Sequence, residues 1–169
     1  MSYVDSSVII ARYMPHDKWY SLADKFFRNN DANFVTPLTL LELYSVFSRL
    51  FEHISFPSKE PVRDRPTALN TLINFVLDDC NLKILSVPHI AEVYIGGIQM
   101  RAPVEYVMSF VWAALLELRS LDLMHIIYSW LVNVKKGVDT FVTADDEIAT
   151  KKVLIQKHLG VKIVHLKDI

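Results

Sequence analysis

Short apolar segments bounded by glycine, proline or polar residues alternate with longer amphipathic segments along the chain. The short segments are rich in β-branched and aromatic residues, and they predict five strands at residues 2–4, 33–36, 83–87, 139–143 and 162–166. The longer segments have helical spacing and predict eight helices at residues 7–13, 18–28, 37–52, 67–79, 89–99, 103–119, 121–134 and 146–158. Because strands alternate with helices, the pattern indicates an α/β fold with a parallel sheet covered on both faces.

The 169 residues are expected to form one domain, residues 1–169. Residues 53–66 contain three prolines and charges of both signs, which is typical of an exposed loop or an inserted flap. Residues 67–119 contain several predicted helices and only one short strand, the third. This part of the chain therefore predicts a helical elaboration on one side of the sheet.

The composition excludes several classes of protein. Apolar residues make up 51% of the chain, which is enough for a sizeable core, and a net charge of −1 excludes a strongly basic nucleic-acid coat. The single cysteine excludes an internal disulfide and every cysteine-rich zinc site. The longest uncharged run, residues 123–134, is too short to span a bilayer. Without a targeting segment, a cytoplasmic location and no membrane partner are expected.

Acidic residues occupy comparable positions in four predicted elements. Asp5 follows the first strand, Asp145 follows the fourth, and Glu42 and Asp122 lie near the beginnings of two apolar helices. In open parallel sheets, ligands bind beyond the carboxyl ends of the strands, at the point where the strand order reverses. We therefore expect the four carboxylates to converge on one rim of the sheet.

Four carboxylates in one pocket repel one another, and some would be neutralised by protonation if no cation were bound. Mg²⁺ and Mn²⁺ accept oxygen ligands, and a metal held beside a phosphate activates water and stabilises the leaving oxygen. The acids therefore predict a divalent metal site that serves phosphodiester hydrolysis.

Each acid also has a structural interpretation. Asp5 is equally compatible with capping a helix, and Asp145 suits the first turn of a helix. Glu42 fits a capping box, although Pro37 argues against one, and Ser120 or Asp122 could cap the helix that Asp122 begins. Four acids at equivalent ends of different elements favour the functional interpretation. His125 lies one turn after Asp122, where a core or supporting histidine is favoured over a metal ligand.

Three basic residues are candidates for contacts with RNA phosphates, because each lies within two helical turns of a proposed acid: Arg49, Lys151 and Lys152. Isolated cations are also common on solvated surfaces. A separate apolar segment, residues 106–116, is hydrophobic on more than one face and predicts either the centre of the helical cap or a homodimer interface.

Four motifs resemble those of the PIN-domain nucleases in order and context: VDSS with Asp5, TLLEL with Glu42, LDLMHI with Asp122, and TADDEI with Asp145. The resemblance spans nearly the whole chain. It implies a three-layer α/β/α sandwich with a five-stranded parallel sheet in the order 3-2-1-4-5, here with extra helices between the third and fourth strands. It also implies that these four acids are catalytic, that Asp5, Asp122 and Asp145 hold the metal, and that Ser7 and Thr143 support it.

The function implied by this resemblance is a Mg²⁺- or Mn²⁺-dependent endoribonuclease acting on single-stranded or structured RNA. Many small members are VapC-type toxins, which form homodimers and are silenced by an antitoxin protein, so both partners are expected here. The stretch between Glu42 and Asp122 is longer than in compact toxins. The alternative is a non-catalytic PIN-like protein that binds RNA or serves as a scaffold.

Overall fold

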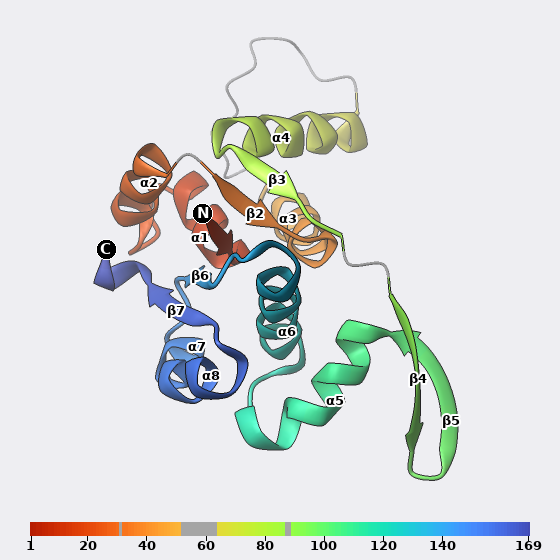
Figure 1. Cartoon of the computed structure of the whole chain (residues 1–169). Helices are drawn as coiled ribbons and strands as arrows, with labels where there is room; N and C mark the ends of the chain where they lie inside the picture. Colours follow the sequence, from red (N-terminus) through yellow and green to blue (C-terminus); the bar gives the residue numbers. More distant parts are fainter. Residues whose placement is uncertain (31, 52–63, 87–88) are drawn as a thin grey trace.

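The computed structural model describes residues 1–30, 32–51, 64–86 and 89–169. A sheet of five parallel strands lies at its centre (Figure 1), in the order β3-β2-β1-β6-β7. The strands are β1 (Ser2–Val4), β2 (Asn33–Val35), β3 (Leu82–Ile84), β6 (Thr140–Thr143) and β7 (Lys162–His165). This order differs from the predicted 3-2-1-4-5 in its numbering, because two unpredicted strands precede β6 in the chain.

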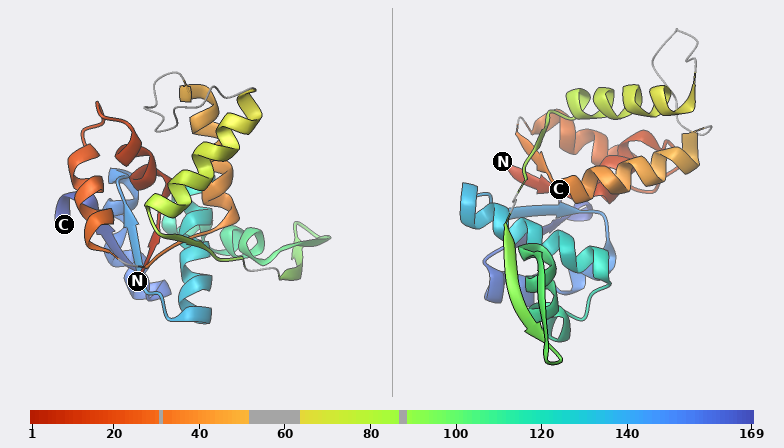
Figure 2. Two further views of the ribbon diagram at one scale, coloured as in Figure 1. Left: turned by 90° about the horizontal axis from the view of Figure 1, so that it is seen from above. Right: turned by 90° about the vertical axis from the view of Figure 1, so that its right-hand side faces the viewer.

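Helices cover both faces of the sheet, which separates two apolar cores (Figure 2). Successive residues of a strand point to opposite faces, so Val4 and Val142 enter one core while Tyr3 and Phe141 enter the other. The first core is built mostly by α1 (Ser6–Tyr13), α2 (Tyr20–Asn29), α3 (Pro37–Leu50) and α4 (Arg65–Asp79). The second is built mostly by α5 (Val104–Leu116), α6 (Ser120–Lys136), α7 (Asp146–Thr150) and α8 (Lys152–Leu159).

The predicted helix at residues 89–99 is wrong, because this segment belongs to an antiparallel hairpin of β4 (Ile90–Ile95) and β5 (Ile98–Pro103). Gly96 and Gly97 join the two strands with φ angles of 58° and 81°. Positive φ at both central residues is the geometry that a tight hairpin turn requires, and glycine adopts it without strain. The hairpin packs against α5 and projects from the body of the molecule (Figures 1 and 2).

Two further boundaries differ from the prediction. The segment at residues 146–158 forms two helices, α7 and α8, which meet at Lys151. Most of the predicted loop at residues 53–66 lies outside the described residues, but its last two residues belong to the first turn of α4. Asp64 caps that helix by accepting a hydrogen bond from the Thr67 backbone N–H at 2.8 Å. Among the described helices, none combines the length and apolarity needed to cross a membrane.

Candidate metal centre

The topology brings the four predicted acids to the same edge of the sheet. Strands β1 and β6 are parallel neighbours, so Asp5 and Asp145 follow their carboxyl ends side by side. Helix α3 begins directly after β2, and α6 begins at this edge because its other end leads into β6. Glu42 and Asp122 therefore approach the same rim from two helices.

Asp5 is buried and held by hydroxyl groups from two elements. Its Oδ2 accepts hydrogen bonds from Ser7 Oγ at 2.6 Å and Thr143 Oγ1 at 2.8 Å. These hydroxyls in turn accept backbone N–H groups of Ala144 and Asp145, at 3.1 and 3.0 Å. Asp5 occupies the position before α1, but its side chain makes no capping bond to that helix. The hydroxyls thus orient Asp5 Oδ2, while Oδ1 takes no part in these bonds.

Glu42 forms a second, connected cluster with His125. His125 Nε2 lies 2.6 Å from Glu42 Oε2, which also accepts a hydrogen bond from Ser6 Oγ at 2.6 Å. The other ring nitrogen, Nδ1, lies 3.0 Å from the hydroxyl of Tyr3, itself 3.0 Å from Thr36 Oγ1. His125 is 1% exposed. The histidine is therefore a buried support for Glu42, with both ring nitrogens partnered.

Attraction between opposite charges stabilises the buried pair of His125 and Glu42. Burial by itself would lower the pKa of His125, but Tyr3 and the carboxylates of Glu42 and Asp5 raise that pKa well above its ordinary value. Burial would raise the pKa of Glu42, but the hydrogen bond and charge of His125, with the Ser6 hydroxyl, lower it. Both shifts favour a charged imidazolium next to a charged carboxylate over two neutral groups.

The remaining two acids share one guanidinium. Arg119 Nε lies 3.0 Å from Asp122 Oδ2, and an Arg119 Nη lies 3.2 Å from Asp145 Oδ2. Asp145 Oδ1 caps α7 by accepting the backbone N–H groups of Glu147 and Ile148, at 2.7 and 3.2 Å. Asp145 therefore caps α7 with one oxygen, one position before the first turn where the structural interpretation put it, and Arg119 binds the other oxygen.

The pKa values of Asp122 and Glu42 shift in opposite directions. Burial raises the pKa of Asp122, and the charges of Asp145 and Asp5 raise it further against the opposing charge of Arg119. The pKa of Glu42 is instead lowered. The expected raising of pKa by neighbouring acids therefore applies to Asp122 and not to Glu42, where His125 and Ser6 act in the opposite direction.

The donor set fits a divalent cation. Among the described residues, Asp5, Glu42 and His125 place one possible ligand atom each within 4.8 Å of one another, and Asp122 and Asp145 are not part of this group. Nε2 of His125 contacts Glu42, so His125 could serve as a ligand only if that contact opened and the ring were neutral. Protein groups hydrogen-bond to Oδ2 of Asp5 and to Oε2 of Glu42. In Asp145, Oδ1 caps α7 and Oδ2 contacts Arg119. Carboxylates that are oriented in this way are typical of metal ligands and their supporting contacts. This cluster of two carboxylates and one imidazole could therefore hold a metal ion.

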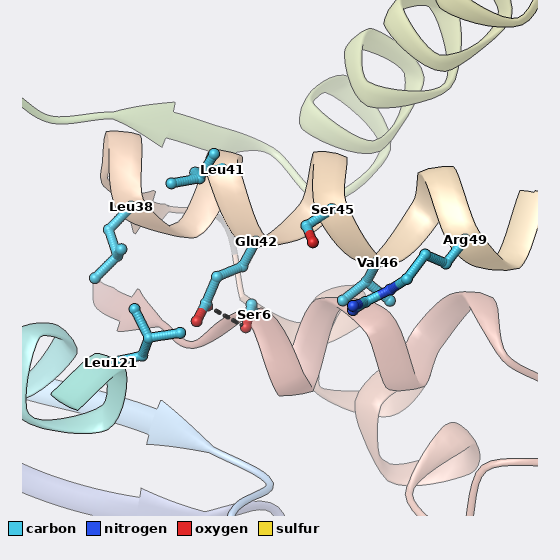
Figure 3. Close-up of a pocket in the computed structure, with 8 residues that line it drawn as sticks. All are labelled: Ser6, Leu38, Leu41, Glu42, Ser45, Val46, Arg49 and Leu121. Carbon is cyan, nitrogen blue, oxygen red and sulfur yellow. Dashed lines mark hydrogen bonds between the residues drawn. The ribbon is translucent and has the colours of Figure 1, made fainter. Parts of the chain in front are cut away.

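A cavity of about 490 Å³ opens beside the site, along α3. In Figure 3, Glu42 points toward Ser6 at one part of this cavity, and Arg49 lies farther along the helix. The wall between them is mainly apolar. The lining residues are Ser6, Leu38, Leu41, Glu42, Ser45, Val46, Arg49 and Leu121.

The other two predicted RNA-binding residues lie away from this cavity lining. Lys151 Nζ contacts Glu117 Oε2 at 3.1 Å, and Lys152 Nζ lies 4.0 Å from Asp168 Oδ2. Both lysines therefore have acidic neighbours, whereas Arg49 faces the cavity next to the acids.

The sequence does not single out Arg119, whereas the expectation of a core or supporting histidine at position 125 agrees with its buried contact to Glu42. Both lie three residues from Asp122, one on each side, and this spacing places side chains on one face of a helix. Tyr3 was read only as part of a strand, and nothing in its local sequence shows that its hydroxyl reaches His125. No protein-family model matches the chain, and no curated protein matches it. The PIN-domain resemblance therefore remains a hypothesis.

Proposed function

We propose that this protein is a metal-dependent endoribonuclease that hydrolyses phosphodiester bonds of single-stranded or structured RNA. One observation carries the proposal: carboxylates from four separate elements gather at the carboxyl edge of a parallel sheet, and supporting groups orient them. The choice of RNA as substrate, and a role as the toxin of a toxin–antitoxin pair, rest on the PIN-domain resemblance.

Asp5, Asp122 and Asp145 would hold Mg²⁺ or Mn²⁺ through their carboxylate oxygens. A bound divalent cation supplies an acidified water and stabilises negative charge on a phosphate. Glu42 orients the attacking water, and the buried His125 keeps the Glu42 carboxylate ionised and fixed in direction. Ser7 and Thr143 fix Asp5 in the same way.

The cavity along α3 suits a nucleotide next to the cleaved bond. Leu38, Leu41 and Leu121 offer an apolar surface on which a base can pack, and Leu41 is 67% exposed. Arg49 lies about 10 Å along the helix from Glu42, which is two helical turns. Its guanidinium suits a phosphate of the same strand.

The test is cleavage of a mixed RNA pool with Mg²⁺, with Mn²⁺, or with EDTA. We expect metal-dependent cleavage that Asp145→Asn reduces at least about 100-fold, since outer supporting residues alone cost up to about 100-fold. Asparagine is a good helix cap, so α7 should remain folded. Asp139→Asn is the matched control, because Asp139 is exposed at the opposite end of β6. Cleavage that survives both EDTA and Asp145→Asn would contradict the proposal.

A non-catalytic RNA-binding or scaffold protein is the second candidate, and one observation favours it. His125 and Arg119 already compensate the acids, so the fold does not need a metal to neutralise its site. Under this alternative, Mg²⁺ and Mn²⁺ leave the melting temperature unchanged, and RNA binds without being cut.

A further inference from the structure

Arg119 occupies the position where a cation would be expected between the predicted metal ligands. Its guanidinium contacts Asp122 at 3.0 Å, Asp145 at 3.2 Å and Glu147 at 3.2 Å. These acids come from α6, from the end of β6, and from α7. One side chain therefore joins three elements at the rim of the site.

The place of Arg119 in the chain makes this arrangement unusual. Arg119 is the residue that precedes the first turn of α6, where the helix dipole favours negative charge and disfavours a cation. Its side chain is 67% exposed, so burial contributes little to holding it. The three acids are thus the main attraction for the guanidinium, and a competing cation on those acids would release it.

We propose that Arg119 is the internal counter-ion of the metal-free site, that a divalent cation displaces it from Asp122 and Asp145, and that the released guanidinium binds a phosphate oxygen of the RNA. This inference rests on the proposed function. The same carboxylate oxygens, Asp122 Oδ2 and Asp145 Oδ2, serve Arg119 now and are in the set that would ligate the metal. Guanidinium and cation therefore compete.

Arg119 is close in sequence to the cavity described above. Leu121, two residues further along the chain, lines that cavity, and a substrate strand that extends past Leu121 toward Asp122 would reach the guanidinium. The planar fork of arginine matches phosphate oxygens in two-point contacts. Arg119 would then contact substrate only after the metal has bound, which makes cation and phosphate binding sequential.

Displacement can be measured without RNA. The Arg119 Nε–H donates to Asp122, so its proton resonance in a ¹⁵N-labelled sample should differ from that of a solvent-exposed arginine. Loss of the signal in Arg119→Lys assigns it. We expect Mg²⁺ to move this resonance to the solvent-exposed position. A resonance that stays in place while calorimetry shows Mg²⁺ binding would overturn the inference and leave the proposed function standing.

Metal affinity gives a second measurement. Arg119→Gln should bind Mg²⁺ roughly tenfold more tightly than wild type, because the competing ion pairs are removed. Arg101→Gln is the matched control, since Arg101 is 74% exposed and ion-paired to Glu92 on the hairpin. Equal affinities for wild type and Arg119→Gln would contradict competition. Absence of Mg²⁺ binding by the wild type would overturn both the inference and the proposed function.

Cleavage tests the contact with phosphate. At saturating Mg²⁺, Arg119→Gln should lose about 100-fold in kcat/KM while it binds the metal more tightly, because one donor to the reacting phosphate is gone. A merely structural role would weaken metal binding and cleavage together. Tighter metal binding with unchanged kcat/KM would show that Arg119 is displaced but does not touch the substrate.

Discussion

Asp5 uses its two carboxylate oxygens differently, and this makes it the sharpest single-residue test of the metal site. Two hydroxyls hold Oδ2, and an asparagine oxygen can accept the same bonds. Asp5→Asn should therefore fold, while it loses the negative charge that attracts a cation.

We expect saturating Mn²⁺ to raise the melting temperature of the wild type by about 5–10 °C, since a ligand at a hundred times its Kd adds about 2.7 kcal/mol. Asp5→Asn should lose most of this rise. The measurement is thermal unfolding with and without Mn²⁺, and Asp139→Asn should behave as wild type. A full metal-induced shift in Asp5→Asn would show that Asp5 is not a ligand.

The acids of the site could be predicted from sequence, but their partners could not. Asp5 and Asp145 follow strand ends, and adjacent parallel strands bring such positions together whatever the details of packing. The bond between Tyr3 and His125 joins residues 122 positions apart. Such a contact depends on how α6 is rotated over the sheet, which no local pattern encodes.

At the scale of elements, strand ends were predicted well and the hairpin was missed. Five short apolar segments bounded by turn residues became the five strands of the sheet. In residues 89–99, a short segment with β-branched and aromatic residues (Val93, Tyr94 and Ile95) precedes a Gly–Gly pair, which is a hairpin signal. The helical elaboration expected there is therefore partly a two-stranded hairpin that packs on α5.

Helix α5 buries its charged residue and exposes apolar residues. Its only charged residue, Glu105, is buried and accepts a hydrogen bond from the Tyr128 hydroxyl at 2.7 Å. Its outer face carries exposed apolar side chains, including Phe110 at 53% and Val111 at 62% exposure. Exposed apolar surface of this kind is typical of an interface. The homodimer stays a prediction, and this face of α5 is its candidate interface.

We expect the wild type to be a dimer at micromolar concentration and Phe110→Glu to be monomeric, because a buried charge without a partner disfavours association. Light scattering or sedimentation gives the mass. Val153→Glu is the control, since Val153 is 74% exposed and belongs to a different helix, α8. A monomeric wild type would exclude this interface.

For the molecule as a whole, a net charge of −1 means that few cations are available to bind RNA. Each phosphate contact contributes roughly one unit to the slope of binding affinity against salt concentration on logarithmic axes. Because Arg49 lines the cavity beside the acids, we expect Arg49→Gln to lower that slope by about 1.

Fluorescence anisotropy with single-stranded RNA at several salt concentrations measures this slope. Arg28→Gln is the matched control, because Arg28 lies in the last turn of α2 as Arg49 does in α3. Equal slopes for the two variants would remove Arg49 from the RNA-binding surface.

Asp145 caps α7 with one carboxylate oxygen and faces the site with the other, and these two roles affect how descendants of this protein would diverge. A lineage that abandoned catalysis would still need the Asp145 oxygen that begins α7, so drift would retain that residue or replace it with another capping residue. Asp122 caps no helix through its side chain, and its bond to Arg119 lies at the exposed rim. Under the proposed function, Asp122 would be the first acid to disappear, and its retention would separate cleaving from non-cleaving homologues better than retention of Asp145 would.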